Sequence, residues 1–119
     1  MTTLNAKLVT VLKTVCAQVH PGVAAWDTPR PYLVYQRVGG QVWDYEDNTP
    51  AAEQHAMVQV TAWADTDAAA LALITSVCDA LRAATTVTAW PDTQPEEDGA
   101  ADLGRYAYRQ DFSLYANSA

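Results

Sequence analysis

Basic residues are scarce in this chain of 119 residues, which has seven Lys and Arg against fourteen Asp and Glu. The formal net charge is therefore −7 at pH 7, and the seven basic residues are scattered along the sequence. A nucleic-acid-binding protein needs a basic patch that displaces counterions from phosphates, and an anionic membrane surface attracts cations. We therefore predict that neither a nucleic acid nor a membrane is a partner.

Long apolar runs are absent as well, since no segment reaches the roughly 18 residues of a membrane-spanning helix. The first twenty residues carry Lys7 and Lys13 inside an apolar pattern. A secretory signal instead places its charge before an uninterrupted apolar stretch. We expect one domain, residues 1–119, that is made and kept in the cytoplasm.

Residues suited to catalysis or metal binding do not occur at useful spacings. The two cysteines, Cys16 and Cys78, form no CxxC pair, and His20 and His55 have no second ligand nearby in sequence. No serine sits in a GxSxG turn, and the five glycines form no phosphate-binding loop. The sequence therefore predicts no catalytic residues, no cofactor and no metal, and the protein is not expected to be an enzyme.

A calcium-binding loop is the nearest match among metal motifs, and it fails. Asp44, Glu46 and Asn48 have the required alternation of oxygen ligands. The sixth position of such a loop should be glycine and the twelfth a bidentate glutamate. Thr49 and His55 stand there instead, so we interpret this run as a solvated loop.

The clearest structural signal runs from His55 to Ala83, where a two-residue alternation passes into a helical period. Residues 55–64 alternate as a strand does, and residues 66–83 place apolar side chains at three- and four-residue steps. Thr66 or an Asp beside it can accept hydrogen bonds from the free N–H groups at the start of this helix. The residues that we expect on the buried side of the strand are Ala56, Val58, Val60, Ala62 and Ala64.

The remaining elements follow from the same periodicities. We predict one further helix, ended by His20-Pro21-Gly22, together with three further strands and two polar connections, of which the second is expected to be mobile. The helix covers 3–19, the strands cover 31–38, 85–90 and 105–116, and the connections cover 39–54 and 91–104.

These elements predict an α+β fold with a mainly antiparallel four-stranded sheet, in the order α-β-β-α-β-β, and two helices packed on one face. The other face should mix aromatic and polar side chains, which is plausible for a protein contact surface. Its members are Gln59, Thr61, Trp63, Arg109 and Tyr115.

The long connection 39–54 is the second candidate for contact with a partner. Trp43 and Tyr45 stand there among the acidic residues Asp44, Glu46 and Asp47. Aromatic residues in a loop either fold back on their own domain or anchor a partner, and the sequence leaves both open. With Trp63 and Arg109 of the sheet, these five residues form our predicted protein interface.

Four pieces in order resemble the tail completion, or tail terminator, proteins of long-tailed bacteriophages and prophages, which join head to tail. An amphipathic N-terminal helix precedes PYLVYQRV at 31–38, a variable loop follows, VQVTAWA at 58–64 leads into an Ala-rich helix, and YAYRQDFSL closes at 106–114. The resemblance covers nearly the whole chain. Its motifs are mostly hydrophobic patterns, and the family has no catalytic motif to check.

The resemblance implies a structural virion or prophage protein. Such proteins form a ring, commonly a hexamer, on the head-proximal end of the tail tube, so the implied partners are sister copies, the tail tube protein and the head connector or neck protein. The implied location is the tail–neck of the virion, after assembly in the bacterial host cytoplasm. A net charge of −7 per copy also predicts assembly favoured by salt or divalent cations.

The alternative hypothesis is a stand-alone cytoplasmic α+β binding module for a small ligand or a protein. A closed pocket with a few converging polar groups would favour it. A protein that stays monomeric at high concentration would also favour it.

Overall fold

The computed structural model describes residues 4–24, 28–39, 53–99 and 104–117. The elements in chain order are α1 (Leu4–Lys13), β1 (Val19–Pro21), β2 (Tyr32–Arg37), β3 (Glu53–Ala64), α2 (Asp67–Ala83), β4 (Thr88–Pro91), β5 (Glu96–Glu97) and β6 (Tyr106–Asn117). The protein is thus α+β with two helices, as predicted.

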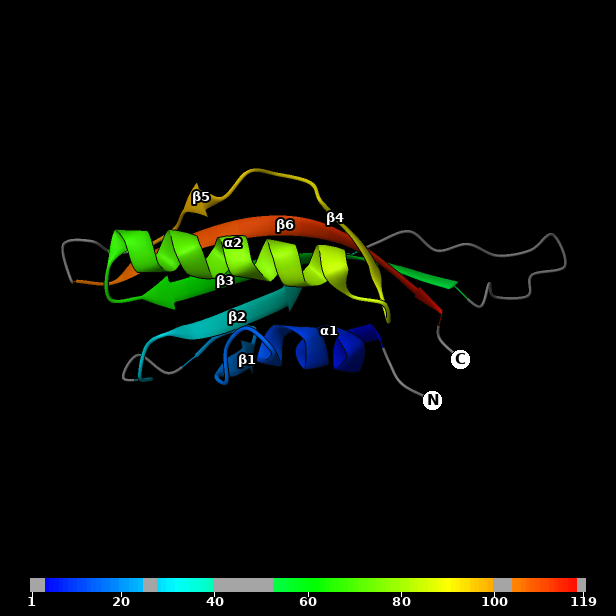
Figure 1. The fold of residues 1–119 in the computed structure, drawn as a ribbon, viewed down its shortest axis with the longest axis horizontal. Helices are drawn as coiled ribbons and strands as arrows, with labels where there is room; N and C mark the ends of the chain where they lie inside the picture. Colours follow the sequence, from blue (N-terminus) through cyan, green and yellow to red (C-terminus); the bar gives the residue numbers. More distant parts are fainter. Residues whose placement is uncertain (1–3, 25–27, 40–52, 100–103, 118–119) are drawn as a thin grey trace, which may run out of the picture.

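The sheet has six strands rather than the four that we predicted. Its order is β1-β2-β3-β6-β4, and β5 also pairs with β6 (Figure 1). The β1–β2 pair is parallel, whereas the other pairs are antiparallel. The predicted four-stranded antiparallel sheet and its α-β-β-α-β-β order are therefore corrected to a mixed sheet with two additional short strands, β1 and β5.

The first helix is shorter than the predicted 3–19, and β1 begins at Val19, the last residue that the helical period had assigned to it. The helix ends at Lys13, where bonds from Thr14 N to Val11 O and from Val15 N to Leu12 O close a tight turn. Val15 and Val19 still pack against the core. Because the same apolar side chains serve a helix face or a turn followed by a strand, periodicity alone could not separate the two structures.

β3 and β6 form the centre of the sheet, and their pairing runs from Glu53↔Asn117 to Ala64↔Tyr106. The predicted alternation along β3 is confirmed, since Ala56, Val58, Val60, Ala62 and Ala64 are all buried. The chain then turns into α2, where Thr66 Oγ1 accepts a hydrogen bond from Ala69 N at 3.1 Å. The structure therefore selects Thr66 as the N-cap from the alternatives that the sequence left open.

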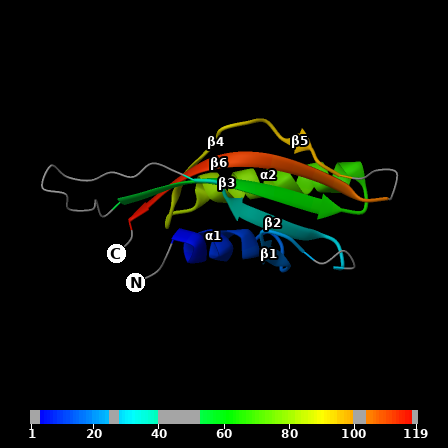
Figure 2. The same ribbon diagram turned by 180° about the vertical axis from the view of Figure 1, so that it is seen from behind.

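Both helices pack on the same face of the sheet, as expected. Figure 2, seen from behind, shows α2 lying behind β3 and β6. Leu8 and Leu12 of α1 and Ile74 of α2 belong to the same buried cluster as Leu33 and Phe112 of the sheet. Each such fully buried side chain contributes about 1.5–3 kcal/mol, so this single core holds the helices to the strands.

The opposite edges of the sheet come from opposite parts of the chain. β1, with α1 close by, lies at one edge, and β4 and β5 lie at the other (Figure 1). The predicted strand 85–90 is observed as β4 at Thr88–Pro91, and β5 lies inside the stretch that we predicted to be a mobile connection. The acidic C-terminal region thereby forms an edge of the sheet.

Candidate functional site

The face of the sheet opposite the helices, here called the polar face, carries the candidate interface residues that the structure describes. Side chains directly opposite each other in paired strands point to the same face, and one such row joins Val34, Thr61 and Arg109. The next row joins Tyr32, Trp63 and Ala107. The predicted grouping of Thr61, Trp63 and Arg109 on one face is therefore confirmed.

A hollow of about 320 Å³ opens on the polar face between Trp63 and Arg109. Tyr32 stacks on Trp63 with ring centroids 6.0 Å apart, and His20 meets Tyr32 edge-on at 5.9 Å. This stacking leaves Tyr32 only 4% exposed although it does not belong to the main core. The remaining lining residues are Gly22, Val23, Ala24, Val34, Gln36, Gln59, Thr61 and Asp98.

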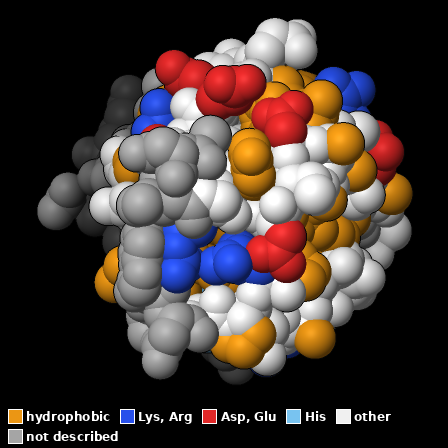
Figure 3. Space-filling model, turned by 90° about the vertical axis from the view of Figure 1, so that its left-hand side faces the viewer, with side chains coloured by type: hydrophobic (Ala, Val, Ile, Leu, Met, Phe, Trp, Pro, Cys, Tyr) orange, Lys and Arg blue, Asp and Glu red, His pale blue; other side chains and the backbone are white. Residues whose placement is uncertain are grey.

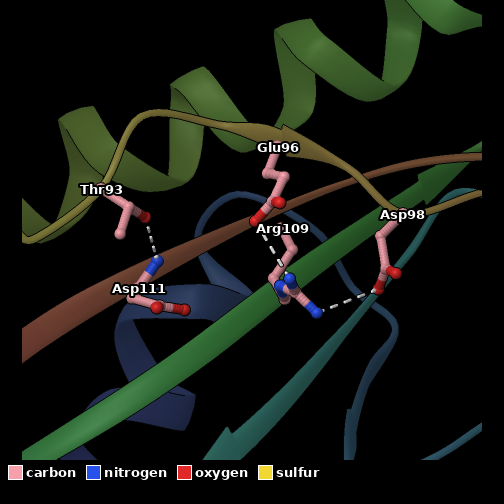
Figure 4. Close-up of polar contacts among 5 residues, drawn as sticks. All are labelled: Thr93, Glu96, Asp98, Arg109 and Asp111. Atoms are coloured by element: carbon pink, nitrogen blue, oxygen red, sulfur yellow. Dashed lines mark hydrogen bonds and ion pairs between the residues drawn. The ribbon is translucent and has the colours of Figure 1, made fainter.

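Arg109 is held by carboxylates on the neighbouring segment rather than left as an isolated cation. Its Nη2 lies 3.0 Å from Glu96 Oε2, and its Nη1 lies 4.0 Å from Asp98 Oδ2 (Figure 4). The hydrogen bond to Glu96, with the charge of Asp98, raises the pKa of the Arg109 guanidinium. Because these pairs are partly exposed, each is worth about 0–1 kcal/mol, so they position the segment more than they stabilise the fold.

The segment that carries these carboxylates, residues 91–99, is here called the acidic segment, and it is bonded along β6. Asp92 N donates to Asp111 O at 2.8 Å, Asp111 N donates to Thr93 Oγ1 at 3.0 Å, and Asp98 N donates to Ala107 O at 2.9 Å. The prediction of a mobile connection was therefore wrong for residues 92–98. The polar composition of this segment suggested disorder, but its polar groups form hydrogen bonds with backbone groups along the edge of β6.

Two side chains of β6 add to this attachment. Gln110 is 5% exposed, and its Nε2 donates to Thr93 O at 2.8 Å. Ser113 Oγ donates to Asp92 Oδ2 at 2.7 Å. Neither contact was foreseen, although a buried position for Gln110 in an otherwise apolar strand pattern was a usable signal.

Gly99 ends the acidic segment at a close backbone approach. A Cβ there would lie 2.6 Å from Ala107 N and 2.7 Å from Arg105 O. Only glycine fits such a distance without displacing the backbone of β6.

Tyr108 links the acidic segment to the start of α2 on the helix-bearing side of the sheet. Its hydroxyl donates to Asp67 Oδ1 at 2.8 Å and lies 3.2 Å from Glu97 Oε1. The hydrogen bond to Asp67, followed by burial and the neighbouring carboxylate charges, raises the pKa of Tyr108 to about 12.

A second aromatic group lies farther along the polar face. Tyr115 stacks on His55 at 4.5 Å and meets Trp90 edge-on at 5.1 Å. Trp90 is 53% exposed and Met57, one row away from Tyr115, is 40% exposed. Sequence reasoning placed Tyr115 on this face, and the structure adds Trp90 from β4, an outermost strand of the sheet.

The other five predicted interface residues, Trp43, Asp44, Tyr45, Glu46 and Asp47, lie outside the described residues. The geometry above therefore concerns Trp63 and Arg109 alone. Both line the hollow.

Within the described ranges, no three His, Cys, Asp or Glu side chains come close enough to hold a metal ion. Cys16 and Cys78 are both free thiols. Neither of the two helices is long and apolar enough to cross a membrane. The described part of the site consists of aromatic stacks, amides and compensated charges, which suit contact with another protein.

Comparison with known proteins gives a consistent result. The family described as "Tail completion protein gp17" matches residues 4–110. Among solved structures, a chain of the "Virion of native gene transfer agent (GTA) particle" superposes with a TM-score of 0.64 at 18% identity, covering 97% of this chain and 95% of that one. At this identity the superposition supports the fold alone. No curated protein matches the sequence.

Proposed function

We infer the function from the family, since this chain belongs to the tail completion protein gp17 family. The resemblance that its motifs suggested is therefore confirmed, and the chain is a virion-associated structural protein of the phage-tail type. The proposal goes further. Residues 1–119 act as one domain that assembles into a ring, caps the head-proximal end of the tail tube and helps to join tail to head.

The observation that carries this proposal is the family match over residues 4–110, which includes both helices and β1–β5. The polar face agrees with a role in assembly. It offers Trp63 and Arg109 around a hollow, and an exposed Trp90 in the same cross-strand row as the exposed Met57. Large aromatic residues and arginine are the residue types most enriched at protein interfaces. The proposed role is structural and involves no catalysis.

The proposed partners are sister copies, a tail tube protein and a head connector or neck protein. A hexamer is the proposed ring number, by family resemblance. Copies that contact one another head to tail form a ring when the rotation between them closes. The protein is proposed to assemble in the host cytoplasm and to remain at the tail–neck of the particle, without nucleic-acid or membrane contacts.

The decisive experiment removes the protein from particles that depend on it. Tails assembled without it should be overlong or unjoined in electron micrographs, and adding back the full chain should restore joined tails. Tails of normal length that join heads without the protein would contradict the proposal.

A matched pair of variants tests the polar face within that assay. Val23 lines the hollow and is 81% exposed, whereas Leu71 is 40% exposed on α2. Val23→Glu should impair joining, because a charge at an interface centre is costly to desolvate. Leu71→Glu adds the same charge away from the polar face and should join tails normally. Equal activity of the two variants would exclude the hollow from the interface.

The hollow also supports the second candidate, a stand-alone binding module. Its volume of about 320 Å³ lies at the lower end of ligand-pocket sizes. A protein that stays monomeric at high concentration and does not affect tail length would favour this candidate.

A further inference from the structure

The charges of this protein are segregated in space, although they look scattered along the sequence. The described residues of the first third, 4–24 and 28–38, contain Lys7, Lys13, Arg30 and Arg37 and no acidic residue. The acidic segment contains Asp92, Glu96, Glu97 and Asp98 and no basic residue. The seven basic residues are scattered along the sequence, but four of them lie in its first third.

Strand order places these two groups at opposite edges of the sheet, although Asp98 and the residues after β1, Gly22–Ala24, border the same hollow on the polar face. α1, β1 and β2 lie at one end of the order β1-β2-β3-β6-β4, and the acidic segment follows β4 at the other end. Figure 1 shows α1 and β1 at the bottom and β5 at the top. Seen from one end in Figure 3, acidic side chains gather near the top with basic side chains at the margins, and a basic group lies lower with an acidic side chain against it.

Part of this charge is compensated within the chain. Arg30 Nε lies 2.6 Å from Asp65 Oδ1, and Arg109 faces Glu96 and Asp98. The charges that remain for a partner are clearest at Lys13 and Arg37. Lys13 is exposed, and the recorded partner of Arg37 is the neutral amide of Asn5, at 3.4 Å.

Three basic residues, Arg82, Arg105 and Arg109, line pockets together with the acidic segment, whose four carboxylates exceed them in number. Arg109 is shared between two carboxylates, while Glu97 and Asp92 accept hydrogen bonds from the uncharged hydroxyls of Tyr108 and Ser113. All four carboxylate residues of the acidic segment are exposed. Each copy therefore presents an acidic edge and a basic edge, which are the opposite edges of its sheet.

We infer that copies of this chain pack side by side, with the acidic segment of one copy against the α1–β2 edge of the next. This inference rests on the proposed ring and names the surfaces that build it. Pairing either edge with its own kind would place like charges together, which disfavours a two-fold dimer through these edges. A head-to-tail arrangement instead satisfies both edges of every copy, and it closes into a ring when the rotation allows.

The inference predicts how assembly depends on salt. The Debye length is about 30 Å at 0.01 M salt, about 10 Å at 0.1 M and about 3 Å at 1 M. As the salt concentration rises, the long-range repulsion between copies of net charge −7 is therefore screened first. The short-range attraction between an acidic edge and a basic edge in contact is screened only at higher salt. Assembly should rise from 0.01 M to about 0.1 M and fall again towards 1 M, measured as weight-average mass by sedimentation. A rise that continues to 1 M would overturn the inference.

Cross-linking locates the contact directly. A carbodiimide couples a lysine amine to a carboxylate without a spacer, so it joins only groups in contact. Mixed ¹⁵N-labelled and unlabelled full-length protein, treated at about 0.1 M salt, should give a peptide that joins Lys13 of one isotope to residues 92–98 of the other. If the mass rises but Lys13 is joined elsewhere, the ring proposal survives and this inference fails. Protein that stays monomeric without such a cross-link also overturns the inference.

Charge reversal supplies the matched control. Lys13→Glu changes the basic edge, and the double variant Ala72→Glu/Ser76→Glu makes the same change of −2 in net charge at exposed positions of α2 outside the pocket that Asp92 lines. The first should weaken self-association about tenfold or more, and the second by less than about twofold, because only the first places like charges at the contact. Equal effects would show that net charge alone matters and would overturn the inference.

A mixing experiment separates a specific contact from damage to the fold. The double variants Lys13→Glu/Arg37→Glu and Asp92→Lys/Glu97→Lys should each fail to assemble alone, since both edges of each carry one sign. Their equimolar mixture should assemble with alternating copies. Recovery supports the inference and also shows that both variants are folded. If the mixture stays monomeric while each variant retains the wild-type circular dichroism and unfolding transition, the inference is wrong.

Discussion

Replacing Gly99 with alanine tests whether the acidic segment is held against β6 as the structure indicates. The added Cβ would lie 2.6 Å from Ala107 N, 2.7 Å from Arg105 O and 2.9 Å from Tyr106 Cα. All three are backbone atoms of the neighbouring strand, so no side chain can rotate out of the way. The backbone of one segment must move.

The protein can respond to the added methyl group in two ways, and the cost of each sets the expected loss in the free energy of unfolding. Forcing the methyl group into place is overpacking, which costs about 1–3 kcal/mol. Lifting the end of the segment loses the bond from Asp98 N to Ala107 O, worth about 1 kcal/mol. It also loosens the exposed pairs of Arg109, worth about 0–1 kcal/mol each. Since the cheaper response wins, Gly99→Ala should lower the free energy of unfolding by about 1–2 kcal/mol.

Urea unfolding measures the loss of global stability, and amide hydrogen exchange measures the local opening of the acidic segment. The denaturation midpoint should fall, and the Asp98 amide should lose protection while amides of the β3–β6 pair keep theirs. Gly104→Asn is the control, because Gly104 has φ +69° with open space around it and Asn tolerates that conformation. Its stability should stay within about 0.5 kcal/mol of the wild type. An unchanged midpoint with a protected Asp98 amide in Gly99→Ala would refute the argument.

Three further predictions concern stability. Thr66→Ala should cost about 1 kcal/mol in urea unfolding because α2 loses its cap, and Thr66→Ser should restore most of it. Phe112→Ala should lower the free energy of unfolding by about 3–5 kcal/mol, because Phe112 is only 1% exposed. Ser113→Ala, one residue away, should lower it only slightly. Tyr108 has a folded pKa raised to about 12, above its ordinary value of 10. Its contribution should therefore be complete below pH 10 and lost as the pH rises towards 12, as followed by unfolding at several pH values. In Tyr108→Phe this pH dependence should be weaker.

Periodicity in the sequence was sufficient for the elements that carry the core. β3 and α2 were predicted within two residues at each end, because alternation and helical spacing both follow from which side chains are buried. The sequence also indicated where this helix is capped, because Thr66 and the Asp residues beside it directly precede the helical apolar pattern. These features depend on residues that are close in sequence, so side-chain periodicity and capping preferences were enough to predict them.

The two short strands were missed because nothing local distinguishes them. β1 pairs with β2 over Val19–Pro21, and β5 pairs with β6 over Glu96–Glu97. Each depends on a strand that is distant in sequence, and β5 consists of two glutamates, which disfavour strands in isolation. Tertiary contacts decided their conformation, as they also decided that residues 92–98 are bonded along β6.

The candidate site divides in the same way. Trp63 and Arg109 were placed on one face by alternation, and the structure brings them to one hollow. Their partners were not predictable, because Glu96 reaches Arg109 only through the pairing of β5 with β6. Sequence reasoning can thus give the face of a residue but not the neighbour across an unforeseen strand pair.

The segregation of charge shows what the strand order adds to the sequence. Along the chain, the basic residues of the first third are separated from the acidic segment by about fifty residues of mixed composition. The two groups therefore form no sequence motif. The order β1-β2-β3-β6-β4 places the earliest and the latest strands at opposite edges, so a gradient along the chain becomes a gradient across the sheet. In the proposed ring of identical copies, the acidic edge of each copy would meet the basic edge of the next without any further partner.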